Sequence, residues 1–190
     1  KKRVNTQSAA LGVASFFSYY SIGSFLYIDV IGFDYFSYSI FYGTCGLIFL
    51  IGSYLCAQIL PRYGILNTLK IGLSLHASGC CLLLLGYIIY GVNIWLIHPP
   101  VLLIIAGSAL MIGAGIGGTM APFGSIAGAA FAMISFYKFV AAYTISNILV
   151  YYYDGTPYSL GFGLILLNIL SVFLISYFHP VLKELTPTSE

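Results

Sequence analysis

The chain has 190 residues, of which 60% are hydrophobic, 17% aromatic and 6% charged, and its formal net charge is +2. Water-soluble domains carry about 25% charged residues, so this composition argues against a soluble domain and predicts a polytopic membrane protein. The seven Lys and Arg residues are scattered along the chain and form no basic patch, which excludes a nucleic-acid binder.

Six stretches are long enough to cross a membrane, because a transmembrane helix needs about 20 mainly apolar residues. The breaks between them contain charged residues, proline or glycine, which end helices. We predict an all-α polytopic membrane protein whose six helices form one bundle over residues 8–178. The predicted spans are 8–28, 38–60, 68–91, 100–120, 126–151 and 159–178, and the breaks are 29–37, 61–64, 93–99, 121–124 and 154–157.

The charged residues predict the orientation of these spans, because short cytoplasmic loops retain Lys and Arg. With the N-terminus inside, the inner side holds six of the seven basic residues, whereas the outer side holds Asp29, Asp34 and Asp154 and no basic residue. Both termini are therefore predicted to be cytoplasmic. Residues 1–7 form the N-terminal cytoplasmic segment, and residues 179–190 form a disordered tail.

No pattern in the sequence predicts enzyme activity. The four cysteines lie in apolar runs without CxxC spacing, so we expect small packing residues rather than a disulfide framework or a metal site. The chain has no His-Glu-x-x-His, no Gly-rich phosphate loop before a lysine and no Gly-x-Ser-x-Gly elbow. We therefore predict no catalytic residue and no bound metal.

Two ionisable residues fall inside the predicted spans. Lys138 lies mid-span, where a charge costs at least about 2.5 kcal/mol. It faces a water-filled cavity, where it binds an anionic group or responds to coupled protonation, or else it snorkels or forms an ion pair. His76 either takes part in proton coupling or hydrogen-bonds between helices. His98 and His179 lie at span boundaries, and we assign them no role.

Small residues are concentrated in the fourth span and at the start of the fifth. Such residues let helix backbones approach closely, and helix packing is their predicted role. A hinge beside the proline in this region is the alternative. The residues concerned are Gly113, Gly115, Pro122 and Gly128.

Three stretches resemble a known family. The first is the loop between the second and third spans, Gly52-x5-Gln58-x3-Arg62-x-Gly64-x5-Lys70-x-Gly72. The second is Gly113-x-Gly115 leading to Ala121-Pro122-Phe123, and the third is Ala127-Gly128-Ala129-Ala130-Phe131-Ala132. Over about residues 9–178 the chain resembles the C-terminal half of a major facilitator superfamily transporter, most closely the Bcr/CflA group of drug-resistance efflux proteins.

The resemblance implies twelve helices in two six-helix bundles that rock about a site at the membrane midplane. It implies a multi-pass protein of the inner (plasma) membrane that exports drugs by alternating access, with the proton gradient as the energy source and no bound cofactor. Residues Arg62, Gly64 and Lys70 would form the cytoplasmic gate loop. The chain would be a C-terminal fragment, inactive without an N-terminal six-helix half supplied in cis or in trans.

Apolar and aromatic side chains around a central cavity suit a small amphipathic drug, which needs few specific hydrogen bonds. The candidate cavity residues are Tyr19, Tyr20, Phe25, Phe136 and Lys138, and core packing is the alternative role of each aromatic among them. One alternative is uptake of a metabolite by the same fold, which would require more buried polar groups than this sequence offers. Another is a stand-alone six-helix membrane protein, a channel subunit or assembly scaffold, that works as an oligomer.

Overall fold

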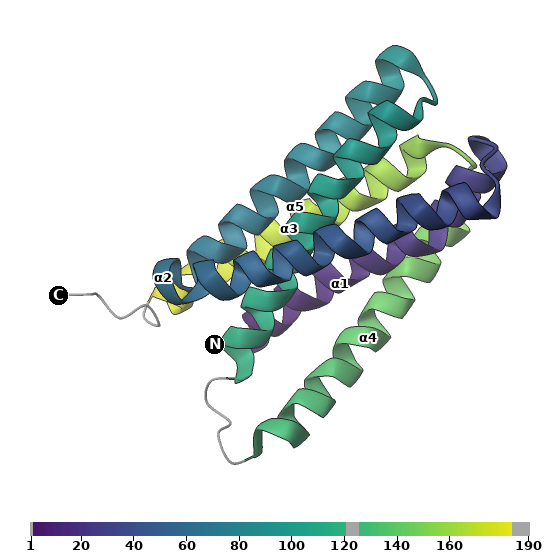
Figure 1. Ribbon diagram of the computed structural model, residues 1–190. Coiled ribbons are helices and arrows are strands. Elements are labelled where there is room, and N and C mark those ends of the chain that lie inside the picture. The colour runs from purple at the N-terminus through teal and green to yellow at the C-terminus, as the bar shows by residue number, and fades with distance from the viewer. Residues whose placement is uncertain (1, 121–125, 184–190) are drawn as a thin grey trace.

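A computed structural model describes residues 2–120 and 126–183 of the chain. Every regular element in this part is helical (Figure 1). The elements are α1 (Lys2–Ser24), the π-helix η1 (Phe25–Val30), α2 (Tyr35–Tyr90), α3 (Ile94–Met120), α4 (Ala127–Tyr151) and α5 (Pro157–Lys183). Among the described residues, α2, α3 and α4 are long and apolar enough to cross a membrane. The all-helical class with membrane-crossing helices is confirmed at this level.

Helix α2 contains the second and third predicted spans in one element. Gly64 interrupts it with a φ of 74° and a ψ of 171°, a left-handed backbone that favours glycine. Figure 1 shows the chain doubling back there, so α2 has a first arm, residues 35–63, and a second arm, residues 65–90. The described part of the chain therefore has five α-helices instead of the six predicted, because the break at 61–64 is a kink rather than a loop.

Three predicted boundaries are corrected by the structure. Asn93 begins α3 six residues early, because its Oδ1 accepts from the amide of Trp95 at 3.0 Å. Pro99 therefore lies inside a helix instead of in a loop. The first predicted span ends at residue 28, but η1 extends this helix to Val30. At the other end, α5 continues to Lys183, so the first part of the predicted tail is helical.

Helices α1 and α3 cross in the interior and run in opposite directions. Gly12 of α1 packs against Met111 in the second half of α3, and Leu26, just beyond α1, shares a core cluster with Ile97 at the start of α3. Helix α1 also packs against α4 and α5, and α3 packs against α2. Helix α4 stands at the edge of the bundle, mainly against α1 (Figure 1).

Four further helix pairs fall into two kinds. Two pairs are parallel. Helix α1 runs parallel to α4, with Ala14 near Ala142 and Ser21 near Ser146. Helix α3 runs parallel to the first arm of α2, with His98 near Thr44 and Gly117 near Leu60. Two other pairs are antiparallel. Helix α1 runs against α5, with Val13 in one cluster with Leu167 and Ile22 in one cluster with Leu160. Helix α3 runs against the second arm of α2, with Gly107 near Gly72 and Leu96 near Gly86. The second arm also packs against α5, where Leu84 meets Gly161.

Candidate functional site

The structure places four of the predicted cavity residues in different environments. Tyr19 is buried in the core, with 3% of its surface exposed. Tyr20 is half-buried, and its ring lies 4.4 Å from that of Tyr42 on the first arm of α2. Phe25 on η1 and Phe136 on α4 are exposed. Tyr20 and Phe25 therefore reach the surface of α1 and η1, whereas Tyr19 faces the interior.

Lys138, the fifth predicted cavity residue, lies on the buried face of α4. Only 4% of its surface is exposed, although its neighbours Tyr137 and Phe139 are exposed. Its Nζ lies 5.9 Å from the ring centre of Phe131 and 5.7 Å from that of Phe139, within the range of cation–π attraction. Helix α4 contains no acidic residue, and the two rings that face this cation, those of Phe131 and Phe139, belong to the same helix.

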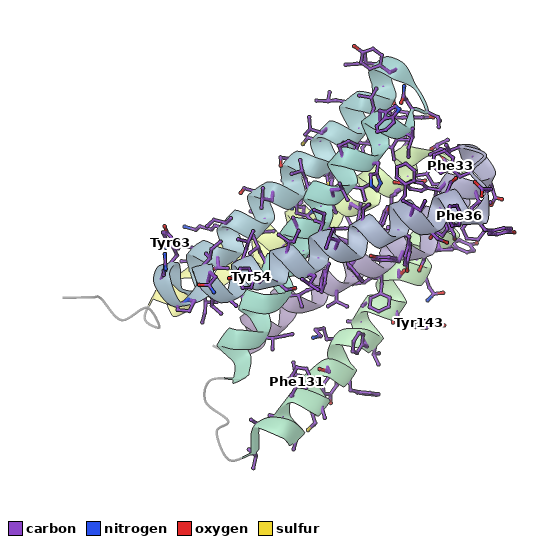
Figure 2. The ribbon with its side chains drawn as sticks, viewed as in Figure 1. Phe33, Phe36, Tyr54, Tyr63, Phe131 and Tyr143 are labelled. Atoms are coloured by element: carbon purple, nitrogen blue, oxygen red, sulfur yellow. The ribbon has the colours of Figure 1, made fainter. Side chains whose placement is uncertain are left out.

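The predicted gate-loop residues gather where α2 doubles back. Arg62 and Lys70 are exposed on either side of the kink at Gly64. Figure 2 shows the exposed Tyr63 at this end of the bundle and Tyr54 further along the first arm. Arg62 ends the first arm near the kink, and Lys70 follows on the second arm.

The predicted packing residues differ in their contacts. A Cβ at Gly113 would lie 2.6 Å from the Sγ of Cys56, so α3 and the first arm of α2 touch there, whereas a Cβ at Gly128 would meet no atom within 4 Å. Gly115 is buried. Pro122 lies outside the described residues.

A buried chain of hydrogen bonds, which the sequence did not predict, joins α1, η1, α2 and α3. Tyr27 of η1 is fully buried, and its hydroxyl lies 2.9 Å from the Nδ1 of His98. The Nε2 of His98 lies 2.9 Å from the Oγ1 of Thr44. On the other side, the hydroxyl of Tyr19 lies 3.4 Å from that of Tyr27 and 3.6 Å from the Sγ of Cys45. We call these five residues the His98 chain.

The direction of each bond follows from its Thr44 end. The Thr44 hydroxyl donates its only proton to the carbonyl of Phe41 at 2.6 Å, so it accepts from Nε2–H of His98. The Nδ1 of neutral His98 is then an acceptor, and Tyr27 donates to it. The Tyr27 oxygen in turn accepts from Tyr19. Every polar group in the chain is paired, with the Cys45 thiol donating at the far end.

The π-helical geometry of η1 accompanies this network. The amide of Ile31 donates to the carbonyl of Leu26 at 3.0 Å, five residues back, as in a π-helix, and such turns occur often at functional sites. Tyr19 and Tyr27 are eight residues apart, a spacing that places two side chains on one helix face. That spacing is the sequence signal that the prediction missed. His98 was interpreted as a boundary residue because Pro99 follows it.

A second buried histidine, His76, connects α2 to α5. Its Nδ1 lies 3.1 Å from the Nδ2 of Asn168 and 3.5 Å from the Sγ of Cys80. The Nδ2 of Asn168 also donates to the carbonyl of Leu73 at 3.2 Å, which identifies it as a donor. Nδ1 of His76 is therefore an acceptor. The proton sits on Nε2, which is buried without a partner. His76 therefore forms a hydrogen bond between helices, which was one of its two predicted roles.

No family model matches the sequence, and searches of curated proteins and of solved structures also found no match. The resemblance to the Bcr/CflA group therefore remains a prediction. Within the part of the chain that the structure describes, no group of three or more His, Cys, Asp or Glu side chains is placed to hold a metal ion.

The carboxylates outside the membrane-crossing helices stabilise turns. Asp154 accepts from the hydroxyl of Thr156 at 2.6 Å and from its amide at 3.0 Å, and these bonds hold the pKa of Asp154 below its ordinary value. Asp34 begins α2 by accepting from the amide of Phe36 at 3.2 Å. Hydrogen bonding by Ser37 lowers the pKa of Asp34 in the same way. Both carboxylates are ionised at neutral pH.

Proposed function

We propose that this chain forms one six-helix half of a secondary transporter of the major facilitator type, which exports small amphipathic drugs across the inner (plasma) membrane in exchange for protons. The observation that carries the proposal is the way in which the helices pair. The first three helical segments are α1 and the two arms of α2, and the last three are α3, α4 and α5. If α1, the first arm and the second arm are exchanged for α3, α4 and α5 in that order, the same helix pairs are found in contact.

The exchange relates each pair to another of the same direction. The parallel pair of α1 with α4 corresponds to that of α3 with the first arm of α2, and the antiparallel pair of α1 with α5 corresponds to that of α3 with the second arm. The exchange turns the pair of α1 with α3 into the same pair, and it does so for the pair of the second arm with α5. Because α1 and α3 run in opposite directions, this pairing is the one expected of inverted repeats, which are typical of secondary transporters.

The exposed surface of α1 and η1 supports an amphipathic cargo. Phe17, Ser21 and Phe25 are exposed there, and α4 flanks them, since the rings of Phe17 and Phe139 are 5.8 Å apart. Exposed rings with an occasional hydroxyl suit a drug that makes few directed hydrogen bonds. We place the drug-binding wall on this surface, opposite a second six-helix half.

Drug accumulation in a pump-deficient bacterium tests the proposal. The chain is expressed alone and together with the N-terminal six helices of a Bcr/CflA-type carrier, and uptake of a fluorescent cationic dye is followed. We expect lower dye accumulation only when both halves are present, and we expect a protonophore to abolish the difference. Phe25→Ala removes a proposed wall residue from an exposed position, and we expect it to weaken export by the pair.

Other results would favour the alternatives. Export by the chain alone would indicate a stand-alone oligomer rather than one half of a transporter. Proton-driven accumulation of a metabolite by the pair would indicate uptake instead. If both halves insert stably and move neither kind of compound, the proposal is wrong.

A further inference from the structure

The His98 chain accommodates either protonation state of its histidine. In the neutral state Nε2–H donates to Thr44 and Nδ1 accepts from Tyr27. When Nδ1 also carries a proton, it donates to the Tyr27 oxygen instead. The Tyr27 hydroxyl then turns toward Tyr19, and the Tyr19 hydroxyl turns toward the Sγ of Cys45, which accepts weakly. All five groups keep a partner, because hydroxyls and thiols both donate and accept.

His76 lacks this freedom. Its Nδ1 faces the amide nitrogen of Asn168, which is held as a donor by the carbonyl of Leu73. A proton on Nδ1 would bring two donors together at 3.1 Å. Unpaired donors in a buried site are costly, so the surroundings of His76 oppose a second proton. The two buried histidines differ in the groups that they face rather than in depth.

We propose that His98 is a proton-binding site, which takes up one proton when the arm formed by Tyr27, Tyr19 and Cys45 reverses its hydrogen bonds. The proton comes from hydronium in the surrounding water, which is left as water. The new bond is Nδ1–H, and no covalent bond in the chain breaks because the hydroxyls only rotate. The role of the site in driving export rests on the proposed function, whereas proton binding itself does not.

The location of His98 suits uptake from one side of the membrane. It is the fifth residue of α3, at the end of the bundle where Asp29, Asp34 and Asp154 lie, and 8% of its surface is exposed. These three carboxylates are on exposed positions, so none neutralises a charged His98 within the core. A proton held without an acidic partner is released readily.

The groups that face His98 are neutral. Tyr27 comes from η1, Tyr19 from α1, and Cys45 from α2, while Tyr38 of α2 lies behind Tyr27 with ring centres 6.0 Å apart. The described parts of α4 and α5 contribute no titratable group to the His98 chain. Because the chain joins α1 to α3, the two helices that cross at the centre of the bundle, the charge on His98 acts directly on their contact.

Nitrogen NMR of the purified full chain, labelled with ¹⁵N-histidine in lipid nanodiscs, tests proton binding directly. The signals are assigned by His98→Gln and by the matched control His76→Gln. We expect the His98 signal to change from one protonated nitrogen to two between about pH 8 and pH 5, whereas His76 keeps its single Nε2–H. A His98 that stays neutral at pH 5 in folded protein, or a His76 that titrates in its place, would overturn the proposal.

Substituting a partner of His98 tests whether the hydrogen bonds of the His98 chain stabilise the bound proton or whether contact with water alone accounts for it. Tyr27→Phe removes the oxygen that accepts from the new Nδ1–H, and bonds to charged donors are stronger than bonds to neutral ones. We expect this variant to lower the titration midpoint by about one pH unit, a tenfold loss of proton affinity. An unchanged midpoint in folded Tyr27→Phe protein contradicts the reversal of the arm.

The transport assay then assigns the role of the proton. In the active pair of halves, His98→Gln should abolish protonophore-sensitive export while dye binding to the purified pair remains, and His76→Gln should leave the coupling intact. If His98 titrates but no pair exports any drug, the proton site stands and the proposed function fails. If the pair exports normally with His98→Gln, the coupling role is refuted.

Discussion

Replacing Gly107 by alanine tests the contact between α3 and the second arm of α2. A Cβ at this position would lie 2.5 Å from the carbonyl oxygen of Gly72 and 2.6 Å from the backbone nitrogen of His76. Both atoms belong to backbone, so no change of rotamer relieves the clash. The two helices would have to separate by roughly 1 Å to regain ordinary contact, which loosens the packing around the buried His76.

Overpacking of this kind costs about 1–3 kcal/mol, whereas alanine in a helix gains about 0.5–1 kcal/mol over glycine. We expect Gly107→Ala to lower the free energy of unfolding by about 1–2 kcal/mol. Gly43→Ala is the matched control, because a Cβ at this helical position meets no atom within 4 Å. It should be neutral or stabilising. Reversible unfolding in mixed lipid–detergent micelles measures both variants, and shifts of the same sign would refute the packing argument.

Three further predictions concern other parts of the bundle. Lys138→Met should make membrane insertion of an isolated α4 segment more favourable by about 2.5–3.5 kcal/mol, and equal insertion would mean that the lysine snorkels. Cysteines at Ser21 and Ser146, whose hydroxyls are 3.2 Å apart, should form a disulfide on mild oxidation while neither single variant does. Failure to cross-link contradicts the pairing of α1 with α4. Asp154 has a lowered pKa, so its ionised form stabilises the turn at neutral pH and this stability is lost as the pH falls through the folded pKa. The protection factor of the Thr156 amide, its intrinsic exchange rate divided by its observed rate at the same pH, should fall as the pH drops below 3.8. Asp154→Ala should show little protection at any pH, and an unchanged protection factor in this variant refutes the cap.

The sequence predicted the class of the protein and several helices closely. The fifth predicted span, 126–151, differs by one residue from α4, because proline and glycine precede it and Asp154 follows it. The fourth span was placed too late because prolines were taken as a break. In the structure the cap at Asn93 starts α3 before Pro99, and the helix tolerates the proline near its N-terminus. Local rules therefore succeed where one signal dominates and fail where a cap and a proline compete.

The orientation of individual side chains was harder to predict. Helices of this composition are apolar on all sides, so their periodicity does not show which face is buried. Tyr19 had a cavity wall and core packing as its two predicted roles, and it is in the core, whereas its neighbour Tyr20 reaches the surface. Lys138 illustrates the same limit, since a mid-span cation is visible in the sequence whereas its burial against α1 is set by tertiary packing.

The two buried histidines show most clearly what only a structure supplies. In the sequence, His76 lies mid-span and looks suited to proton coupling, whereas His98 stands beside a proline at a boundary. The structure gives His76 a fixed amide donor. His98 faces the Thr44 oxygen, which accepts in both states, and the Tyr27 hydroxyl, which donates to the neutral ring and accepts from the charged one. Ability to titrate depends on whether the partners can reverse their hydrogen bonds. That property belongs to contacts between α1, η1, α2 and α3, which are distant in sequence, so the position of a histidine along the chain does not indicate it.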